Sequence, residues 1–594
     1  MKTNRWNRKR RSHRTGQAGQ ATLFILLAMG IFLLGALCFA FDMSNMWFHR
    51  QAAQTAADAA CAAGAMDILV DAQGGATTHQ GFTLGTAYTC TASSTDSVCS
   101  YAAKNGYNSN STRPGNVVSV SFPTNAASGA PPGVPIPPAS LVGAFPFIRV
   151  DIIDHVQTFF VGLLSGRRTA DLRAFSTCGV QPVQSPVPLV ILDPRFADTK
   201  TLNVGGSATL AIYGGPQQSI QVDSPNLNSA YDQGCIDLSQ GGPNIPPTGS
   251  DLGTWGGPAT QTSTTCTAAS GNGFDPGTTG HWLAPNPPLS DPFAQVSAPV
   301  QPTTTQTGYE TVAKGTGECP NVAISECHRY WPGYYPGGIQ VRGAGGTNLA
   351  LSLFVPGIYY VANGFSADSN SCIRPSTLQG DGSGGVMFYF ADTKSINVGS
   401  NSGSKCTDSK GVPIVPAFNT TSGTGYLPYG AKCTATSTVP ANMPSSLTSA
   451  VLLGPCQKPT GPGVPTLCAP NCSLNYGDPQ GVSDPLGEQR GFLFFQNRAK
   501  NAGTNPNWQG GGVMLLAGTM YFHQCVTSGS DTGVSCSTAS AFNDNVTFNG
   551  TPGTTTYILG QIIVDQLTLS GNPAIIMDLN SQTSYSILKA SIFQ

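Results

Sequence analysis

Six acidic residues are the side chains of this sequence best suited to catalysis. Paired carboxylates hydrolyse polysaccharides as general acid and as base or nucleophile. Here the acidic residues share no repeating spacing, and an Asp in a turn is expected for backbone capping alone. The six candidates are Asp193, Asp223, Asp232, Asp381, Asp484 and Glu488. Because no spacing brings two of them together, we predict that the chain is not an enzyme and has no catalytic residues.

Cysteines and histidines are the residues that would hold a metal. The chain has 17 cysteines and 7 histidines, but no C-x-x-C pair. A zinc site would be placed at Cys468/Cys472 or at Cys319/Cys327/His328. Disulfides are favoured instead, because close cysteine pairs lie in stretches rich in Gly, Pro and Ser. H-E-x-x-H, P-loop and EF-hand patterns are absent, so we predict no metal and no cofactor.

The densest aromatic cluster is His328-Arg-Tyr-Trp-Pro-Gly-Tyr-Tyr335. Two interpretations remain open for it: a loop whose rings cover the end of a β-structure, which is favoured, or a surface that binds sugar. Charged residues make up 10% of the chain and the net charge is -1. Beyond the N-terminus there is no basic stripe, so nucleic-acid binding is disfavoured.

A membrane anchor is expected near the N-terminus. Residues 21–41 contain no charged side chain and are long enough to cross a hydrocarbon core of about 30 Å. Seven Lys and Arg side chains precede this run, which keeps residues 1–20 in the cytoplasm by the positive-inside rule. A cleaved signal peptide is the alternative, but the run exceeds the usual apolar region and no convincing cleavage site follows it.

A second helical segment follows the anchor over residues 42–70. Its centre, Gln51 to Ala65, is rich in alanine, which has the highest helix propensity. Together the two segments predict a rod of roughly 75 Å. Small side chains allow a neighbouring helix to approach closely, as in pilin-like subunits that pack into a filament or dock on an assembly platform.

The N-terminal segment resembles the Tad (tight adherence, Flp pilus) TadE/TadG-like family. The residues that carry the resemblance are Gly19, Gln20, Asp42, Gln54, Asp58 and Gly64. The resemblance implies membrane anchoring and partnership with Tad pilus-assembly proteins or pilin subunits through the helix. For Asp58, the alternatives are a helix–helix contact and a solvated position. The resemblance also covers the region after the anchor. There the family has strands and a helix with buried phenylalanines, and this chain has strand-like segments and an expected short helix over 155–164.

This chain also departs from that family. Cys61-Ala62 stands where the family usually has Ala-Leu. Cleavage after Gly19 would put Phe24 where prepilin-peptidase substrates usually have Glu, so processing is not expected to follow that pattern. A D-x-S-x-S metal motif, frequent in large TadG-like members, is absent, and no metal-dependent adhesion site is carried over.

The remainder of the chain is expected to be rich in strands. Residues 71–186 predict a small α+β region with strands at 117–122, 147–153 and 173–178. From residue 187 to 594, short apolar strands recur between Gly-rich turns, which favours a parallel β-helix or solenoid over an irregular β-sandwich. The stretches 225–335 and 400–485 are low in apolar residues and are expected to be cysteine-containing loops.

These expectations combine into one hypothesis. The chain is a membrane-anchored structural or assembly component of a Tad-type pilus, TadG-like, that contributes to surface adhesion or secretion. It crosses the cytoplasmic (inner) membrane once, with its N-terminus in the cytoplasm and a periplasmic or extracellular all-β ectodomain. The alternative is a membrane-tethered carbohydrate-active or carbohydrate-binding β-helix protein, for which a surface polysaccharide would be the partner.

Overall fold

A computed structural model describes most of the chain. The described residues are 17–72, 81–109, 115–124, 129–131, 134, 144–162, 166–184, 187–244, 246–258, 266, 273–289, 291–293, 296, 298–320, 324–341, 349–368, 371–378, 380, 385–392, 394–399, 406–407, 412–419, 444–455, 489, 491–498, 505–509, 514–524, 544–579 and 586–593. The chain forms two compact units. The helix unit comprises Met1–Leu69, Thr77–Gln181 and Ala590–Gln594, and the strand unit comprises Val70–Ala76 and Pro182–Lys589.

The helix unit is built on α1 (Gln17–Ala72), one uninterrupted helix of 56 residues. The apolar side chains between Leu23 and Phe41 are exposed. By length and composition, α1 is the one described helix that could cross a membrane. After Asp42 the helix changes character, because alanines spaced three and four residues apart are fully buried on one face. They are Ala53, Ala56, Ala57 and Ala60.

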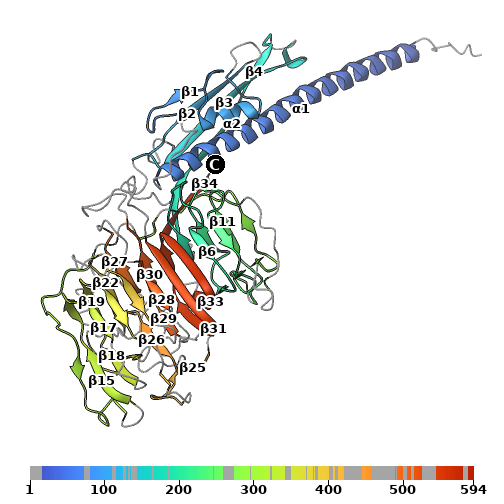
Figure 1. Cartoon of the computed structure of the whole chain (residues 1–594). Helices are drawn as coiled ribbons and strands as arrows, with labels where there is room; N and C mark the ends of the chain where they lie inside the picture. The colour runs from blue at the N-terminus through green and yellow to red at the C-terminus, as the bar shows by residue number, and fades with distance from the viewer. Residues whose placement is uncertain are drawn as a thin grey trace, which may run out of the picture. The chain divides into compact units, whose positions relative to one another are not determined.

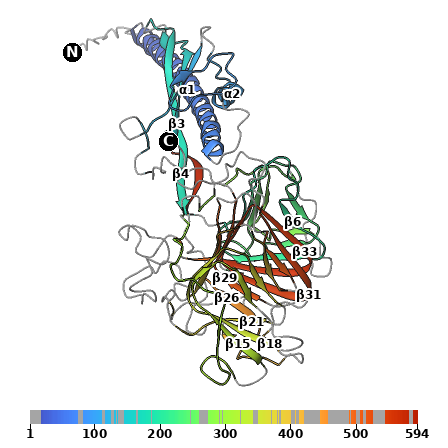
Figure 2. The ribbon, with the colours of Figure 1, turned by 60° about the vertical axis from the view of Figure 1, so that its left-hand side comes forward.

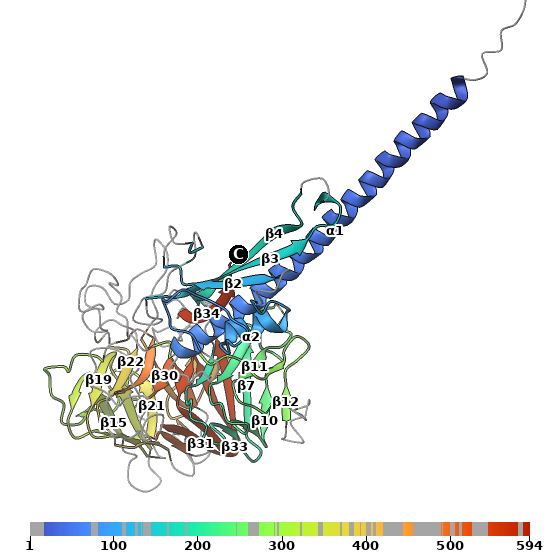
Figure 3. The same ribbon diagram turned by 90° about the horizontal axis from the view of Figure 1, so that it is seen from above.

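A five-stranded sheet accompanies the second half of α1 (Figure 3). Its order is β1 (Tyr88–Thr89), β2 (Asn116–Ser121), β3 (Phe147–Gln157), β4 (Thr169–Gln184) and β34 (Ser586–Ile592). The pairs β1–β2, β2–β3 and β3–β4 are antiparallel. Buried and partly exposed residues alternate along β3, as in a strand with one covered face. A short helix, α2 (Ser97–Lys104), is capped by Asp96, whose side chain accepts from the Cys99 N–H.

One expectation about this unit is wrong. The sequence predicts a short helix over 155–164, but β3 continues to Gln157 and pairs with β4 as far as Gln157↔Thr169, and among the described residues of that range a helical turn is present only at 161–162. Buried and partly exposed positions alternate from Ile148 through Val156, as in a strand with one covered face, and this period continues past the predicted start of the helix.

The strand unit contains two large sheets in which every described pairing is parallel. The ten-stranded sheet has the order β13-β11-β8-β5-β32-β30-β27-β22-β19-β16, and the thirteen-stranded sheet follows the path β12-β10-β7-β33-β31-β28-β23-β20-β17 with β6, β9, β26 and β29 beside it. Their strands are, in chain order, β5 (Leu189–Ile191), β6 (Leu202–Val204), β7 (Thr209–Gly214), β8 (Gln218–Val222), β9 (Ala230–Asp232), β10 (Cys235–Asp237), β11 (Asp251–Thr254), β12 (Gly273–Asp275), β13 (Trp282–Leu283), β16 (Gly333–Tyr335), β17 (Ile339–Val341), β19 (Gly357–Val361), β20 (Phe365–Ala367), β22 (Val386–Phe390), β23 (Ile396–Val398), β26 (Ala450–Leu453), β27 (Phe492–Gln496), β28 (Asn507–Gln509), β29 (Met514–Ala517), β30 (Thr519–Phe522), β31 (Asn545–Leu559), β32 (Ile562–Val564) and β33 (Gln566–Leu579).

Two smaller sheets complete the strand unit. One is four-stranded, with the order β14 (Glu310–Thr311), β15 (Ile324–Tyr330), β18 (Leu349–Phe354) and β21 (Ser371–Pro375). The other pairs β24 (Phe418–Asn419) with β25 (Ser446–Leu447). The segment 225–335, expected to be loops, therefore contains strands β9 to β16. Most of the other expected loop, 400–485, lies outside the described residues.

The order of strands does not follow the order of the chain. The first strand, β5, lies inside the ten-stranded sheet, between β8 and the late strand β32. From β5 the chain moves strand by strand to one edge at β13, resumes at the opposite edge at β16, and returns to β32. The thirteen-stranded sheet is ordered in a similar way. Its C-terminal strands β31 and β33 lie between earlier strands on both sides, as Figure 1 shows.

Residues at equivalent positions of neighbouring strands stack into apolar ladders across the ten-stranded sheet. The inner ladder pairs Ile220 with Leu189, Leu189 with Ile562, Ile562 with Met520, Met520 with Phe494, and Phe494 with Phe388. All six are buried in one core cluster, which also takes residues from the thirteen-stranded sheet. In Figure 2 these sheets are seen after a 60° turn, with β31 and β33 adjacent. Stacked burial of this kind provides the main stabilisation of the unit.

A crossover segment, residues 284–306, joins the two edges of the ten-stranded sheet. Its described side chains Leu289, Phe293 and Val296 pack on the outer face of that sheet, against residues such as Val190 and Tyr389. At its far end, Thr305 forms a parallel bridge with Tyr334 of β16. The segment therefore covers an apolar sheet face that would otherwise be exposed to water.

Candidate functional site at the exit of helix α1

Asp42 marks the end of the apolar half of α1, and its carboxylate is only 1% exposed. It accepts hydrogen bonds from three backbone N–H groups of the segment after β3: Phe159 at 3.1 Å, Phe160 at 2.8 Å and Val161 at 2.6 Å. Hydrogen bonds to an ionised acceptor are stronger than neutral ones. Asp42 therefore fixes this loop to the helix at the level where the apolar run ends.

The loop that Asp42 holds carries exposed aromatic rings. Phe159 is 55% exposed and Phe160 is 44% exposed, so the expectation that these phenylalanines are buried in a helix is wrong. Both rings lie edge-on to Phe41, with centroids 6.0 and 6.2 Å apart. Between the loop and the helix lies an open, apolar groove of about 600 Å³. It is lined by Leu37, Cys38, Ala40, Phe41, Ser44, Phe159 and Phe160.

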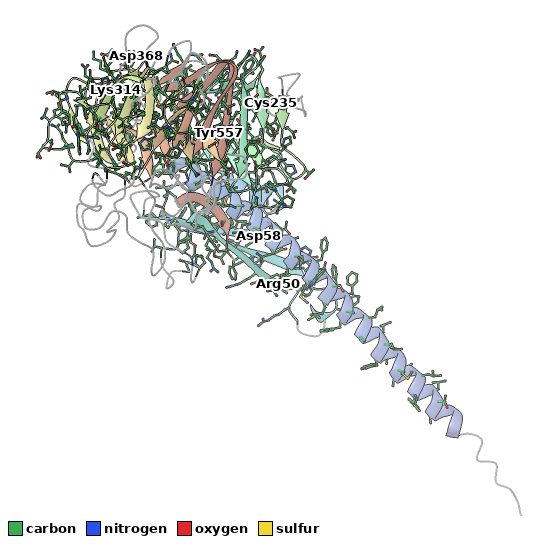
Figure 4. All side chains as sticks on the ribbon, turned by 90° about the horizontal axis from the view of Figure 1, so that it is seen from below. Arg50, Asp58, Cys235, Lys314, Asp368 and Tyr557 are labelled. Atoms are coloured by element: carbon green, nitrogen blue, oxygen red, sulfur yellow. A yellow bond between two sulfur atoms is a disulfide. The ribbon has the colours of Figure 1, made fainter. Side chains whose placement is uncertain are left out.

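Gln54 and Asp58 lie further along α1, and Gln54 contacts the sheet of the same unit. The Gln54 side-chain amide donates to Asp58 at 2.9 Å and to the Phe175 carbonyl of β4, also at 2.9 Å. Asp58 is half-buried, and Figure 4 labels it together with Arg50 on α1. Gln54 thus joins the helix to the sheet within one chain, and Asp58 is bonded to Gln54 along the helix itself. Both alternatives considered for Asp58 stay predictions.

Gly64 and Cys61 bring α1 into its closest contact with the sheet. A Cβ at Gly64 would lie 2.6 Å from Ile148 Cδ1 and 2.8 Å from Val98 Cγ2, so only glycine fits without a shift. One turn earlier, Cys61 lies at disulfide-bonding distance from Cys178 of β4. The cysteine that replaces the family's usual alanine therefore links the helix covalently to the strand.

We predict that Gly64→Ala destabilises the helix unit although alanine favours helix. The added methyl group overpacks a site where Ile148 and Val98 are both fully buried, and such insertions cost about 1–3 kcal/mol. The matched control is Thr55→Ala on the exposed face of α1, expected within about 0.5 kcal/mol of the wild type. Hydrogen exchange of β3 amides measures both. Equal protection in the two variants would contradict the packing role of Gly64.

Comparison with known families bears on this segment. Residues 19–67 match the model of the putative Flp pilus-assembly TadE/G-like (Tad) family. The match covers all six motif residues and ends near the point where α1 leaves the sheet. No curated protein and no solved structure matches the chain. The family match and the apolar helix together indicate a membrane-anchored, pilus-related protein.

The structure separates the motif residues into two groups. Asp42, Gln54, Asp58 and Gly64 all lie where α1 meets the rest of the helix unit. Gly19 and Gln20 lie in the first turns of α1, before the apolar run. Two of the six motif residues therefore lie at the start of α1, and the other four lie where α1 runs beside the rest of its own unit.

Two of the carboxylates considered for catalysis, Asp193 and Asp223, follow the ends of the adjacent strands β5 and β8, and each is held by hydrogen bonds of its own. Asp193 is fully buried, bonded to Arg195 at 2.9 Å and to Gln566 at 2.9 Å. Asp223 is bonded to Gln221 at 3.0 Å and to the Leu289 N–H at 3.0 Å. Asp232 lies in β9. Asp381, Asp484 and Glu488 lie outside the described residues.

The aromatic cluster over 328–335 packs mostly inward. Tyr330 and Tyr335 are 1% exposed, and their hydroxyls donate to the Gln340 and Trp331 carbonyls at 3.1 and 2.6 Å. Three of its residues form β16, the edge strand of the ten-stranded sheet, and its first three belong to β15. Tyr330 and Tyr335 join the core cluster, so the segment is built of strands rather than of the expected loop. The pairs Cys319–Cys327 and Cys90–Cys99 lie at disulfide-bonding distance, as do Cys235–Cys266 and Cys372–Cys406.

A buried polar cluster under the crossover segment was not anticipated from sequence. Asp291 of that segment accepts from the Tyr521 hydroxyl at 2.6 Å and lies 3.7 Å from Arg498 Nη1. The two Arg498 Nη groups donate to the Phe293 and Val296 carbonyls, each at 2.7 Å. His523 lies between Asp565, at 2.6 Å, and Asp291, at 3.9 Å. The cluster occupies the carboxyl ends of β27, β30 and β32, which are adjacent only because of the parallel order.

We expect the strand unit to lose stability as pH rises from about 4 to above 7. Burial raises the pKa of Asp223 to about 7, so the folded state holds a proton there that the unfolded chain has released. Burial by itself would lower the pKa of His523, but the carboxylates of Asp565 and Asp291 outweigh burial and raise it despite the opposing Arg498. Each group therefore binds more protons when folded, and stability falls as those protons are lost.

The measurement is the unfolding temperature of the strand unit at pH 5, 6, 7 and 8. Asp223→Asn, which keeps the shape and removes the titration, is expected to flatten the slope. His523→Gln is expected to flatten only the part above about pH 6.5. A slope that both variants leave unchanged would assign the pH dependence to other groups.

Proposed function

We propose that this protein is a structural component of a Tad-type (Flp) pilus apparatus, TadG-like in organisation, and that it contributes to surface adhesion or secretion. The match of residues 19–67 to the Flp pilus-assembly family carries the proposal. The large β-rich part supplies the surface that faces the environment or the growing pilus. We assign it a structural rather than a catalytic role, which is supported by the use of Asp193 and Asp223 in hydrogen bonds of the fold.

In this proposal, α1 crosses the inner membrane once over residues 21–41. The basic residues before it stay in the cytoplasm, and everything after Asp42 lies outside. Five cysteine pairs at disulfide-bonding distance support that orientation, because disulfides persist in oxidising compartments. Pilus-assembly proteins or pilin subunits are the proposed partners of the exposed first half of α1. Its second half is taken up by the sheet of its own chain.

We further propose that the strand unit is a parallel β-helix. The support is that the chain alternates between two parallel sheets and that equivalent residues stack in ladders from strand to strand. An irregular β-sandwich would place antiparallel pairs in those sheets.

Deletion of the gene in the producing bacterium tests the role. Flp pili at the cell surface and adhesion to a solid support are expected to fall, and the full chain is expected to restore both. The matched variant exchanges residues 21–41 for an unrelated transmembrane helix of the same length and keeps residues 42–69, which contact the sheet. We expect this variant to stay in the membrane but to restore pili poorly. Normal pili in the deletion strain would contradict the proposal, and turnover of a surface polysaccharide by the purified chain would favour the carbohydrate-active alternative.

A further inference from the structure

Three exposed aromatic side chains at the exit of α1 form what we call the aromatic edge: Phe41, Phe159 and Phe160. Phe41 is 57% exposed, and the other two are 55% and 44% exposed. They come from two segments more than a hundred residues apart that meet at Asp42. Apolar rings gathered in this way on a protein surface mark an interaction site.

The aromatic edge is held in place by bonds that leave its rings outside. Asp42 fixes three successive N–H groups of the loop. The base of the loop is closed by Thr158, whose N–H donates to the Arg168 carbonyl at 3.0 Å and whose hydroxyl donates to the Arg167 carbonyl at 2.9 Å. The loop thus presents two adjacent phenylalanines in a fixed position.

We propose that the aromatic edge inserts into the outer interface of the bilayer, with a phospholipid acyl chain in the groove between the loop and α1. This inference rests on the proposed membrane anchoring. The groove shares Leu37, Cys38 and Phe41 with the last turn of the apolar run, so the surface continues without a break from the segment expected to contact lipid. Aromatic residues concentrate at the membrane–water interface, where a ring is half in hydrocarbon and half in headgroups.

The charges beside the aromatic edge favour lipid headgroups as the neighbouring chemistry. Arg167 and Arg168 at the base of the loop are exposed, and Arg50 is exposed two turns beyond Asp42 on α1. The Asp42 carboxylate is turned inward onto backbone N–H groups, and Asp171, beyond the arginines, pairs with His155 at 2.6 Å. An apolar surface rimmed by arginines fits anionic phosphates above acyl chains. The loop then acts as a second membrane contact that sets the depth and tilt of the helix unit.

Site-specific photocrosslinking of the full chain in native membranes tests this inference. Benzoylphenylalanine replaces Phe159 or Phe160, the membranes are irradiated, and adducts on the purified chain are identified by mass spectrometry. Phe32, 74% exposed in the apolar run, is the control for membrane anchoring. Phe175 is the matched negative control, because it is 45% exposed in the same unit. Its carbonyl contacts Gln54, twelve residues or about 18 Å along α1 from Asp42.

Lipid adducts at positions 32, 159 and 160, and none at 175, are the expected result. Asp42→Ala is expected to lower the lipid adduct at position 159 about tenfold, the effect of about 1.4 kcal/mol. The Cys61–Cys178 bond checks that the variant is folded. A lipid adduct at position 32 together with only peptide adducts at position 159 would assign the aromatic edge to a protein partner. That result would overturn the inference and leave the proposed membrane anchoring in place. Lipid at neither 32 nor 159 would overturn the anchoring itself.

Discussion

Arg498→Ala is expected to lower the free energy of unfolding of the strand unit by about 3–5 kcal/mol. The side chain is 5% exposed and binds the crossover segment through the Phe293 and Val296 carbonyls. Its removal leaves Asp291 buried without the nearby guanidinium and takes one donor from each of the Phe293 and Val296 carbonyls. The crossover segment should then detach first, exposing the outer face of the ten-stranded sheet.

The matched control for this prediction is Arg149→Ala in the helix unit. Arg149 pairs with Asp151 at 2.9 Å, but both side chains are partly exposed, and such pairs contribute no more than about 1 kcal/mol. Hydrogen exchange followed peptide by peptide separates the two units. Arg498→Lys supplies one charge without the two-armed geometry and should recover only part of the loss. Full protection of β30 in Arg498→Ala would show that the crossover segment does not depend on this side chain.

Removing the bond between Cys61 and Cys178 should destabilise the helix unit by about 2–5 kcal/mol. The bond closes a sequence separation of 117 residues and joins α1 to β4. The double variant Cys61→Ala/Cys178→Ala creates no new free thiol and restores at position 61 the residue usual in the family. Unfolding in urea of the full chain in detergent, followed through β3 and β4 amides, measures the change.

Cys90→Ala/Cys99→Ala provides the internal comparison, because that pair spans only 9 residues. By loop-closure entropy its loss should cost about 2 kcal/mol less than the loss of the longer link. A larger effect of the short link would contradict the view that Cys61–Cys178 is the bond that fixes the helix to the sheet.

Local patterns were sufficient to predict the long helix of the helix unit. The charge-free run over 21–41 and the alanines after it predict one helix, and α1 runs through both without interruption. The partner of the alanine-rich face could not be predicted in the same way. Small residues suit any closely approaching surface, and here that surface combines the sheet that contributes Ile148 and Phe175 with Val98 of the short helix α2.

Local sequence patterns were not sufficient to predict the strand unit. Strands such as β10 and β11 are only three or four residues long, and each needs a single inward apolar side chain, Ile236 or Leu252. A stretch poor in apolar residues can therefore still form strands, which is why 225–335 resembled a loop. The pairing of β5 with β32 joins residues more than 350 positions apart. No periodicity in the sequence encodes that pairing, nor the buried cluster around His523 that depends on it.

The cysteines show a related limit. Cys61 lies in the alanine-rich part of α1, where no neighbouring cysteine suggests a partner. Its partner, Cys178, comes from a strand that folds back on the helix. Counting cysteines requires knowing which elements meet, and that information is tertiary.

The most direct test of the central claim is the intact mass and thiol content of the native protein, taken separately from membrane, soluble and sheared-surface fractions. A full-length chain in the membrane fraction, with its Cys61–Cys178 link oxidised, is the result expected for a permanently anchored pilus-assembly component. A soluble cytoplasmic chain with free thiols throughout would contradict membrane anchoring. A chain that begins at Gln20 in the sheared fraction would instead mean export into a filament after cleavage at Gly19.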